Sequence, residues 1–327
     1  GLYIEDAGPV IVNSNIAYNT STAGGGVYVK SNTTSTIRNT NIHHNQSNGG
    51  YPNGGGGGIR AGGYFGYNTL APELINVDIY DNSAVYAAAI FYSNVTGIIN
   101  NVEIYNHTGG GYVFKMHGPS WSGNVLINDI YFHNNEGTLL DIESSHPVIN
   151  GCIIVNNSGG DLVSLSARSL ATLSNFIVAE NTASGFSIGG INTSPQLENI
   201  IIAGNSGRAI NSIGGSSYSL SFNNGLIINN AGGAGNISNG PAYLSNLSVI
   251  GNGVLSEYDA EGFTITESGI LYIQESNIFN NGTAIYNNNT SDIVAAENNY
   301  WGHSSGPYHP TQNTSGQGDS LNFFTNI

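Results

Sequence analysis

The sequence predicts an all-β solenoid, a parallel β-helix of about 12 coils, and three observations indicate it. One motif (aliphatic, Asn, two residues, aliphatic, two residues, Asn) recurs eleven times between residues 10 and 281. Its copies are short β-branched runs, and the chain lacks the composition of amphipathic helices. The copies are spaced by 22–29 residues, apart from one interval of 37, which suits three short strands and their turns. A propeller blade would need about 40 residues.

Each copy is expected to form one coil and to contribute one Asn to each of two stacked columns. Asn tolerates the left-handed backbone of turns, and stacked amides form a hydrogen-bonded asparagine ladder. The last position of the motif is Asn19, Asn45, Asn82, His107, Asn134, Asn156, Asn181, Asn205, Asn230, Asn252 and Asn281. Six residues earlier stand Asn13, Asn39, Asn76, Asn101, Asn128, Asn150, Asn175, Asn199, Asn224, Asn246 and Glu275. Adjacent Asn pairs leave some registers open by one residue.

The aliphatic position between the two Asn columns is expected to face inward and to form a continuous core. It is occupied by Ile16, Ile42, Ile79, Ile104, Tyr131, Ile153, Val178, Ile202, Ile227, Val249 and Ile278. We expect one domain, with the coils in residues 1–296 and a Gly- and aromatic-rich insertion at about 48–70. Residues 297–327 are the expected capping segment of the same domain. Because the chain starts at Gly1 without Met, we interpret it as a processed or trimmed segment.

The capping segment contains a G-x-S-x-G pattern at residues 302–306, which elsewhere marks a hydrolase nucleophile. That chemistry needs a strand, a turn and a helix, followed by Asp and then His. Here the surroundings are all-β, and His309 precedes Asp319. We therefore predict that Tyr300 and Trp301 cover the last coil and have a structural role.

The repeats resemble the right-handed parallel β-helix repeat family of pectate-lyase-like and cell-surface proteins, over essentially the whole chain. The tail at 298–324 is similar to the closing segment of secreted β-helix domains, which reads Asn-Asn-Trp-Trp-Gly, Ser-Gly-Pro, Gly-x-Gly-Asp; Tyr300 replaces the first Trp. The resemblance implies a single-stranded, right-handed solenoid in an extracellular or cell-surface protein. It also implies one of two roles, polysaccharide cleavage or a non-catalytic surface, adhesion or fibre module.

Composition excludes several classes of function. The net charge is −15 with only six Lys plus Arg, which opposes binding to nucleic acid or to an anionic membrane. No apolar run approaches the 18 residues of a membrane span. Cys152 is the one Cys, so neither a disulfide framework nor a thiolate metal cluster is expected.

The strands after the Asn turns supply the candidate site. Aligning them stacks Tyr28, Arg60, Ala89, Lys115, Asp141 and Ser164 in one outward column. The neighbouring column holds Lys30, Gly62, Phe91, His117, Glu143 and Ser166. Lys115 would then lie beside Asp141, and His117 beside Glu143. This face is either a glycan groove or a set of ion pairs on a solvated sheet.

If the face is catalytic, the acid and base candidates are Lys115, His117, Asp141 and Glu143. If it binds a glycan, the contacts are expected from Tyr28, Lys30, Arg60, Tyr64, Phe65, Phe91 and Trp121. No cofactor is expected, although Asp259 and Glu261 form a weak Ca²⁺ candidate. His43 and His44 are not expected to share a metal, because adjacent strand residues face opposite sides. N-glycosylation candidates are Asn32, Asn94, Asn192 and Asn288.

The sequence therefore favours a non-catalytic, extracellular surface, adhesion (adhesin) or filament module, with glycan binding as a further role. The alternative is a polysaccharide lyase or glycoside hydrolase that acts along the outward strand face. Expected partners are a second copy of the chain, by end-to-end or lateral assembly, a longer parent chain, or a polysaccharide. End-to-end assembly is expected because Gly1 opens almost directly onto a coil, with an unpaired strand edge.

Overall fold

The computed structural model describes residues 1–30, 34–51, 54–62, 69–109, 111–118, 125–214, 218–253, 262–288, 294–322 and 325–326. The described residues form strands and turns and contain no helix. They divide into two compact units, residues 1–164 with 168–172 and residues 165–167 with 173–327. The fold is the predicted all-β, right-handed parallel solenoid. It has about 10 turns, slightly fewer than the 12 expected, because counting motifs also counts terminal segments that contribute only two- or three-residue strands.

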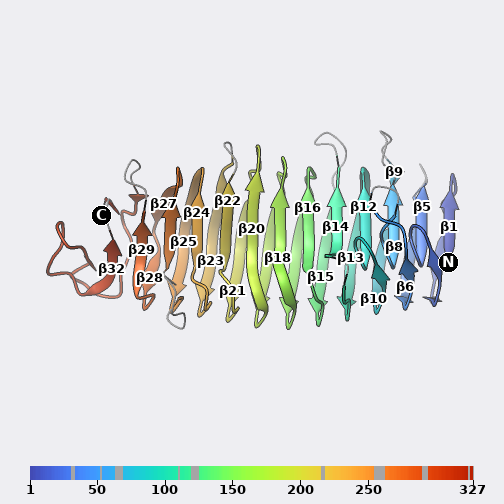
Figure 1. The fold of residues 1–327 in the computed structure, drawn as a ribbon, viewed down its shortest axis with the longest axis horizontal. Coiled ribbons are helices and arrows are strands. Elements are labelled where there is room, and N and C mark those ends of the chain that lie inside the picture. Colours follow the sequence, from blue (N-terminus) through green and yellow to red (C-terminus); the bar gives the residue numbers. More distant parts are fainter. Residues whose placement is uncertain are drawn as a thin grey trace. The chain divides into compact units, whose positions relative to one another are not determined.

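In the first unit, the strands are distributed over three sheets, and their pairings are parallel (Figure 1). Sheet 1 runs β1 (Leu2–Glu5), β5 (Val27–Lys30), β8 (Ile59–Gly62), β12 (Ile90–Ser93), β14 (Tyr112–His117) and β16 (Thr138–Glu143). Sheet 2 contains β2 (Val10–Val12), β3 (Asn15–Ala17), β6 (Thr36–His43), β9 (Thr69–Leu70), β10 (Glu73–Tyr80), β13 (Val95–Tyr105), β15 (Val125–His133) and β17 (Val148–Val155). Sheet 3 consists of β4 (Thr20–Ser21), β7 (Gln46–Ser47) and β11 (Ser83–Ala84).

In the second unit the same alternation continues. Sheet 1 runs β20 (Thr182–Gly190), β22 (Ile210–Gly214), β24 (Gly235–Ser238), β26 (Phe263–Thr266), β29 (Thr283–Asn287), β32 (Gly318–Asn322) and β31 (Pro307–Tyr308). Sheet 2 contains β21 (Gln196–Ala203), β23 (Leu220–Ile228), β25 (Pro241–Ile250), β27 (Ile270–Gln274), β28 (Asn277–Phe279), β30 (Val294–Ala295) and β33 (Thr325–Asn326). Strands β18 (Ser158–Ser166) and β19 (Thr172–Ala179) contain the boundary between the units.

The core is the stack of inward side chains of sheets 1 and 2, and most of the predicted inward positions are buried. Two coils differ from the prediction. Phe132 and Ile154 point inward and are fully buried, whereas the expected Tyr131 and Ile153 face outward. The left-handed turn position in these coils is Asp129 or Gly151, one residue after the expected Asn. Asp and Gly also accept this conformation, so the burial of the following residues decides the register.

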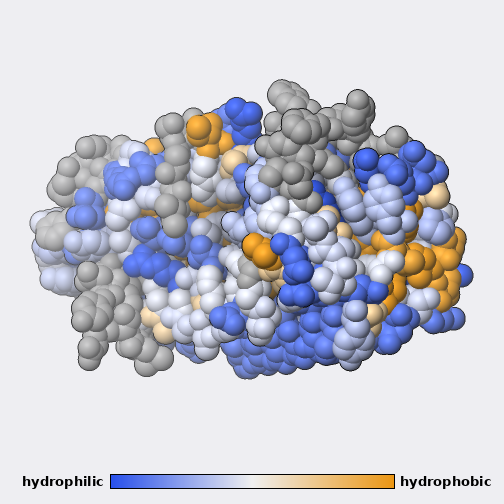
Figure 2. Space-filling view, turned by 45° about the vertical axis from the view of Figure 1, so that its right-hand side comes forward, coloured by the Kyte–Doolittle hydropathy of each residue, from blue (hydrophilic) through white to orange (hydrophobic). Residues whose placement is uncertain are grey.

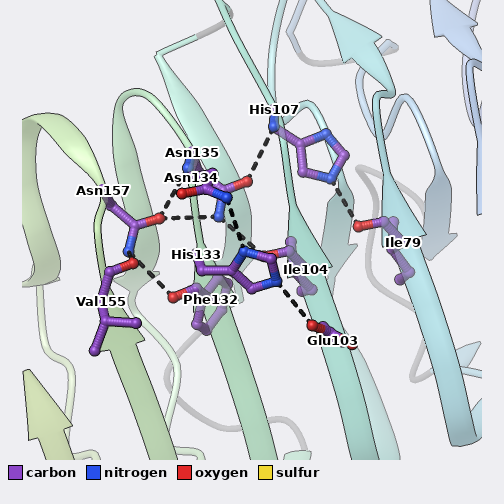
Figure 3. Close-up of polar contacts among 10 residues, drawn as sticks. All are labelled: Ile79, Glu103, Ile104, His107, Phe132, His133, Asn134, Asn135, Val155 and Asn157. Carbon is purple, nitrogen blue, oxygen red and sulfur yellow. Dashed lines mark hydrogen bonds and ion pairs between the residues drawn. The ribbon is translucent and has the colours of Figure 1, made fainter.

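The same one-residue shift corrects the buried asparagine ladder. Its rungs in these coils are Asn135 and Asn157, in place of Asn134 and Asn156 (Figure 3). The main-chain N and side-chain Nδ2 of Asn135 both donate to Asn157 Oδ1, at 2.9 and 3.1 Å. Nδ2 also donates to the carbonyl oxygen of Ile104 at 2.9 Å. Each rung thus makes hydrogen bonds to backbone groups of a turn, which have no partner in a sheet.

His107 occupies one rung of this ladder, as the spacing predicts, and is fully buried. Its main-chain N donates to Asn135 Oδ1 at 3.0 Å (Figure 3). Its ring nitrogens lie 3.0 Å from the carbonyl oxygen of Asn82 and 3.1 Å from that of Ile79. Burial lowers the pKa of His107, although these two carbonyl contacts act in the opposite direction. The imidazole therefore replaces an Asn amide as a partner for backbone carbonyls.

In the second unit the buried ladder runs through Asn205, Asn230, Asn252 and Asn281 and ends on Asp319. The Asp319 carboxylate accepts hydrogen bonds from the main-chain N of Asn280 at 2.9 Å and of Asn281 at 2.8 Å. Burial raises the pKa of Asp319, and these bonds act against that effect. The Asp of the Gly-x-Gly-Asp tail is thus the terminal acceptor of the ladder.

A second, exposed Asn column follows the bend in sheet 2, where residues such as Asn39, Asn76 and Asn101 adopt positive φ values near 50°. Asn76 Nδ2 donates to Asn39 Oδ1 at 3.1 Å, and Asn101 Nδ2 donates to Asn76 Oδ1 at 2.9 Å. The sequence therefore predicted both asparagine ladders correctly in kind. Cys152 is buried, and burial raises the pKa of its thiol.

The first strands leave an apolar surface in the first unit, orange at the right of Figure 2. A hollow of about 690 Å³ there is lined by Leu2, Val10 and Ile11 among others. Val10 is 61% exposed. The expected end-to-end assembly at such a strand edge stays a prediction.

The expected cap residues differ in burial. Trp301 is 4% exposed, and its carbonyl oxygen accepts a hydrogen bond from the main-chain N of Asp319 at 3.0 Å. Tyr300 is 48% exposed. Their role as a cap stays a prediction, and the burial of Trp301 favours this residue over Tyr300 for that role.

Replacing a ladder Asn is expected to destabilise the protein strongly. Asn230→Ala removes three donated and two accepted hydrogen bonds at a fully buried rung. Buried unsatisfied partners cost about 1–3 kcal/mol each, so we expect a loss of about 3 kcal/mol in the free energy of unfolding. Chemical denaturation measures it. The exposed Gln196→Ala is the control and should change stability by less than about 0.5 kcal/mol; equal effects would contradict the ladder's role.

The two cap residues provide a matched pair. Trp301→Ala should lower the free energy of unfolding by about 3–5 kcal/mol, because it leaves a large cavity in a buried site. Tyr300→Ala should cost less than about 1 kcal/mol, because half of this side chain is already exposed. Thermal and denaturant unfolding of the two variants test this order, and a reversed order would show that Trp301 is not the cap.

Candidate functional site

The structure brings the four catalytic candidates together on sheet 1 of the first unit. The register of β14 and β16 places Lys115 beside Asp141 and His117 beside Glu143, as the alignment predicts. Lys115 Nζ donates to Asp141 Oδ2, and to Glu143 Oε2 at 2.7 Å. His117 Nδ1 lies 3.4 Å from the same Glu143 oxygen. We call these four side chains the Lys115 cluster.

The centre of the Lys115 cluster is buried rather than solvated. The side chains of Lys115 and Asp141 are 3% and 5% exposed, whereas Glu143 is 34% exposed. The Lys115 ammonium lies 4.5 Å from the ring centre of Tyr112 and 5.6 Å from that of Tyr86. Aromatic rings thus cover the charge and add cation–π attraction.

Contacts within the cluster favour the charged forms of Lys115 and Glu143. Burial lowers the pKa of Lys115, but the charge of Asp141 and the hydrogen bonds to both carboxylates outweigh it, so this pKa lies above its ordinary value. The close contacts with His117 and Lys115 lower the pKa of Glu143 to about 2, against the effect of burial. A general acid or base needs a pKa near the working pH. Lys115 and Glu143 are therefore suited to an ion-pair network rather than to proton transfer.

The outward columns differ from the alignment at β12. Phe91 lies beside Arg60 and Lys115, where Ala89 was expected, and Ser93 lies beside His117. A shift of two residues keeps every side chain on the same face of the sheet. Hydrophobic alternation therefore cannot detect it.

The glycan-binding candidates of this face are largely internal. Arg60 is 2% exposed and lies between the rings of Phe91 and Tyr28, with its guanidinium carbon 4.8 and 5.6 Å from their centres. Its side chain also donates to the carbonyl oxygen of Gly54. Lys30 is exposed and pairs with Glu5 at 3.2 Å. This part of the face is a packed stack with little polar surface for a ligand.

The remaining candidates are the possible glycosylation sites, which differ in burial, and six residues that the structure does not describe. Asn94 is 7% exposed, whereas Asn192 and Asn288 are exposed at the surface. Six further candidates lie outside the described residues: Asn32, Tyr64, Phe65, Trp121, Asp259 and Glu261.

A second location, which the sequence did not indicate, is a polar groove of about 710 Å³ in the second unit. Its floor is a column of outward side chains on sheet 1, one from each of four successive coils. The strand registers place in this column Asn211, Asn236, Thr264 and Tyr286. Arg208 and Asn288 also line the groove. We call these six residues the polar groove.

The polar groove has the chemistry of a site for a hydroxyl-rich ligand. Its amides and hydroxyls repeat along the axis at the strand spacing of about 4.8 Å, and they both donate and accept hydrogen bonds. Tyr286 adds an aromatic surface with a polar tip. Of the lining residues that the structure describes, none carries a carboxylate. The sequence does carry a signal for this column. It lies in the outward positions of "INSIG", "GNIS", "FTIT" and "TAIYN", which stack when these segments are aligned with the earlier coils.

Within the parts of the chain that the structure describes, no group of three or more His, Cys, Asp or Glu side chains could hold a metal ion. The same parts of the chain contain no helix with the length and hydrophobicity that crossing a bilayer requires.

The comparison with protein families agrees with this geometry. The family described as "Right handed beta helix region" matches residues 1–175, which is more than half of the chain. No curated protein and no solved structure matches this chain.

Protonation of the Lys115 cluster should reduce stability at acidic pH. Because the folded protein lowers the pKa of Glu143 to about 2, its stabilising effect is complete above the unfolded value of about 4.3 and is lost as pH falls towards 2. Denaturant unfolding at pH 6, 4 and 3 measures this loss. Glu143→Gln should be less stable at pH 6 and should lose less on acidification. An unchanged pH profile in this variant would show that Glu143 does not cause the loss.

Proposed function

The chain belongs to the right-handed beta helix family, and on that premise we propose that it is a non-catalytic, extracellular surface module. In this proposal the solenoid is a rigid scaffold, and the polar groove of the second unit binds a neutral oligosaccharide. The family and the solenoid fold suit either a surface protein or an enzyme, so the side chains must decide.

The observation that carries the proposal is the separation of the titratable side chains from the open polar surface. Glycoside hydrolysis needs two carboxylates about 5–9.5 Å apart around the scissile bond. Among the described residues that line the polar groove there is none, whereas the carboxylates of the Lys115 cluster are paired and partly buried in the first unit. The groove can therefore bind a glycan but offers no acid and base to cleave it.

The preference for a neutral glycan follows from charge. The chain carries a net charge of −15, and Arg208 is the one cation among the groove's described lining residues. A polyanionic glycan would be repelled at long range, and a single guanidinium offers limited compensation. Hydroxyl groups, in contrast, match the Asn, Thr and Tyr side chains of the floor.

The alternative is a polysaccharide lyase or glycoside hydrolase that uses the Lys115 cluster. Lys115 would then have to act as a base, but its carboxylate partners raise its pKa and keep it protonated. Its side chain is also 3% exposed. These features favour the binding module.

Binding should depend on the groove floor. In a panel of neutral and acidic oligosaccharides measured by calorimetry, Asn236→Ala and Tyr286→Ala should each weaken binding of the neutral ligand about tenfold, because each removes a hydrogen bond. Tyr243→Ala is the control, because Tyr243 is 49% exposed on sheet 2 of the same unit. It should bind like the wild type.

The same panel tests the alternative. Release of reducing ends or unsaturated products by the wild type, lost in Asp141→Asn, would overturn the non-catalytic assignment. If both groove variants bind as tightly as the wild type, the groove is not the binding site.

A further inference from the structure

His43 and His44 lie much closer together than strand geometry suggests. His43 is the last residue of β6, and His44 adopts a left-handed backbone with φ of 52°. The chain therefore leaves the strand at His44, and the two rings meet instead of facing opposite sides. Their Nδ1 atoms are 2.8 Å apart. We expected that the two histidines would not share a metal because adjacent strand residues face opposite sides. That reason does not apply here, because His44 lies in a turn.

The two imidazoles differ in burial and in how other rings pack against them. His43 is 8% exposed and stacks on Tyr80, with ring centres 4.6 Å apart and planes 8° apart. Tyr80 stacks in turn on Tyr105 at 4.8 Å. The side chain of His44 is 43% exposed, with the ring of Tyr18 at 4.9 Å. One nitrogen is thus fixed by packing, and the other is accessible and can adjust.

The pair has the geometry of two cis ligands on one metal ion. Metal–imidazole bonds are about 2.0–2.1 Å long, so two nitrogens on one ion in tetragonal or tetrahedral geometry lie about 3 Å apart. In a neutral pair, one Nδ1 carries the proton that the other Nδ1 accepts. A metal can bind both Nδ1 atoms after a small rotation of His44 and a change of tautomer, in which the protonated Nδ1 gives its proton to solvent and Nε2 of the same ring takes one up.

A carboxylate lies near the other nitrogen of His44. His44 Nε2 is 3.9 Å from Asp81 Oδ2, which is longer than a hydrogen bond. The negative charge of Asp81 favours the tautomer that carries its proton on Nε2, and this tautomer leaves Nδ1 free to bind.

We propose that His43 and His44 form a binding site for a divalent transition-metal ion of the Cu²⁺ type, held through their two Nδ1 atoms. Two cis imidazoles with water in the remaining positions suit the tetragonal geometry of Cu²⁺, which also binds nitrogen ligands more tightly than the other first-row divalent ions. Because no third His, Cys, Asp or Glu completes a group here within the described residues, the metal exchanges readily. Ca²⁺ and Mg²⁺ prefer oxygen ligands and do not compete.

The test is a Cu²⁺ titration of the full chain at pH 7.5, followed by calorimetry and electron paramagnetic resonance. The wild type should bind one Cu²⁺ with the signature of two equatorial nitrogens. His43→Ala and His44→Ala should each abolish that signature, and Asp81→Asn should weaken binding about tenfold by removing the negative charge near Nε2. His146→Ala, which removes a histidine of the same unit, should leave binding unchanged.

Circular dichroism checks that each variant keeps its β-structure. His44→Ala is decisive, because His44 is exposed and its loss leaves the fold intact. If His44→Ala binds Cu²⁺ like the wild type, or if the spectrum shows fewer than two nitrogens, the two histidines are a hydrogen-bonded pair only. Displacement of Cu²⁺ by excess Ca²⁺ would also overturn the assignment.

Discussion

The buried asparagine ladder is the interaction on which the rest of the structure depends. A solenoid coil turns sharply between sheets 2 and 1, and the backbone groups at this turn lie inside, away from strand partners. Each rung satisfies them twice, through an Oδ1 that accepts from the previous coil and an Nδ2 that donates to a carbonyl, as at Asn135. Because one rung fixes the height of the next, the ladder also sets the register of the outward side chains.

Registered coils convert a sequence spacing into a surface. Side chains about 25 residues apart in sequence become neighbours at the strand spacing of about 4.8 Å. In the first unit this stacking places Lys115 between aromatic rings and two carboxylates, so its charge is paired internally. In the second unit it lines up amides and hydroxyls that remain accessible. The same device thus yields a structural network in one unit and a candidate binding surface in the other.

The sequence was sufficient for the fold, the two ladders, the His107 rung and the pairing of Lys115 with Asp141, because each depends on a repeated spacing. It was insufficient where neighbouring residues compete for one position. Asp129 and Gly151 accept left-handed backbone as Asn128 and Asn150 do, so composition could not select the register. Phe91 moved by two residues, a shift that alternation does not detect. The meeting of His43 and His44 required the backbone angle at His44 itself.

The distribution of the few cations explains why the three candidate sites differ in chemistry. Of the six Lys and Arg residues, Lys115 and Arg60 are buried and Lys30 is paired with Glu5. With these three cations buried or paired, few of the six remain free to balance the 21 Asp and Glu, and the surface potential is negative. Such a surface repels polyanions, which makes an uncharged glycan the consistent ligand for the polar groove. It attracts divalent cations, and among them the imidazoles of His43 and His44 select those that prefer nitrogen.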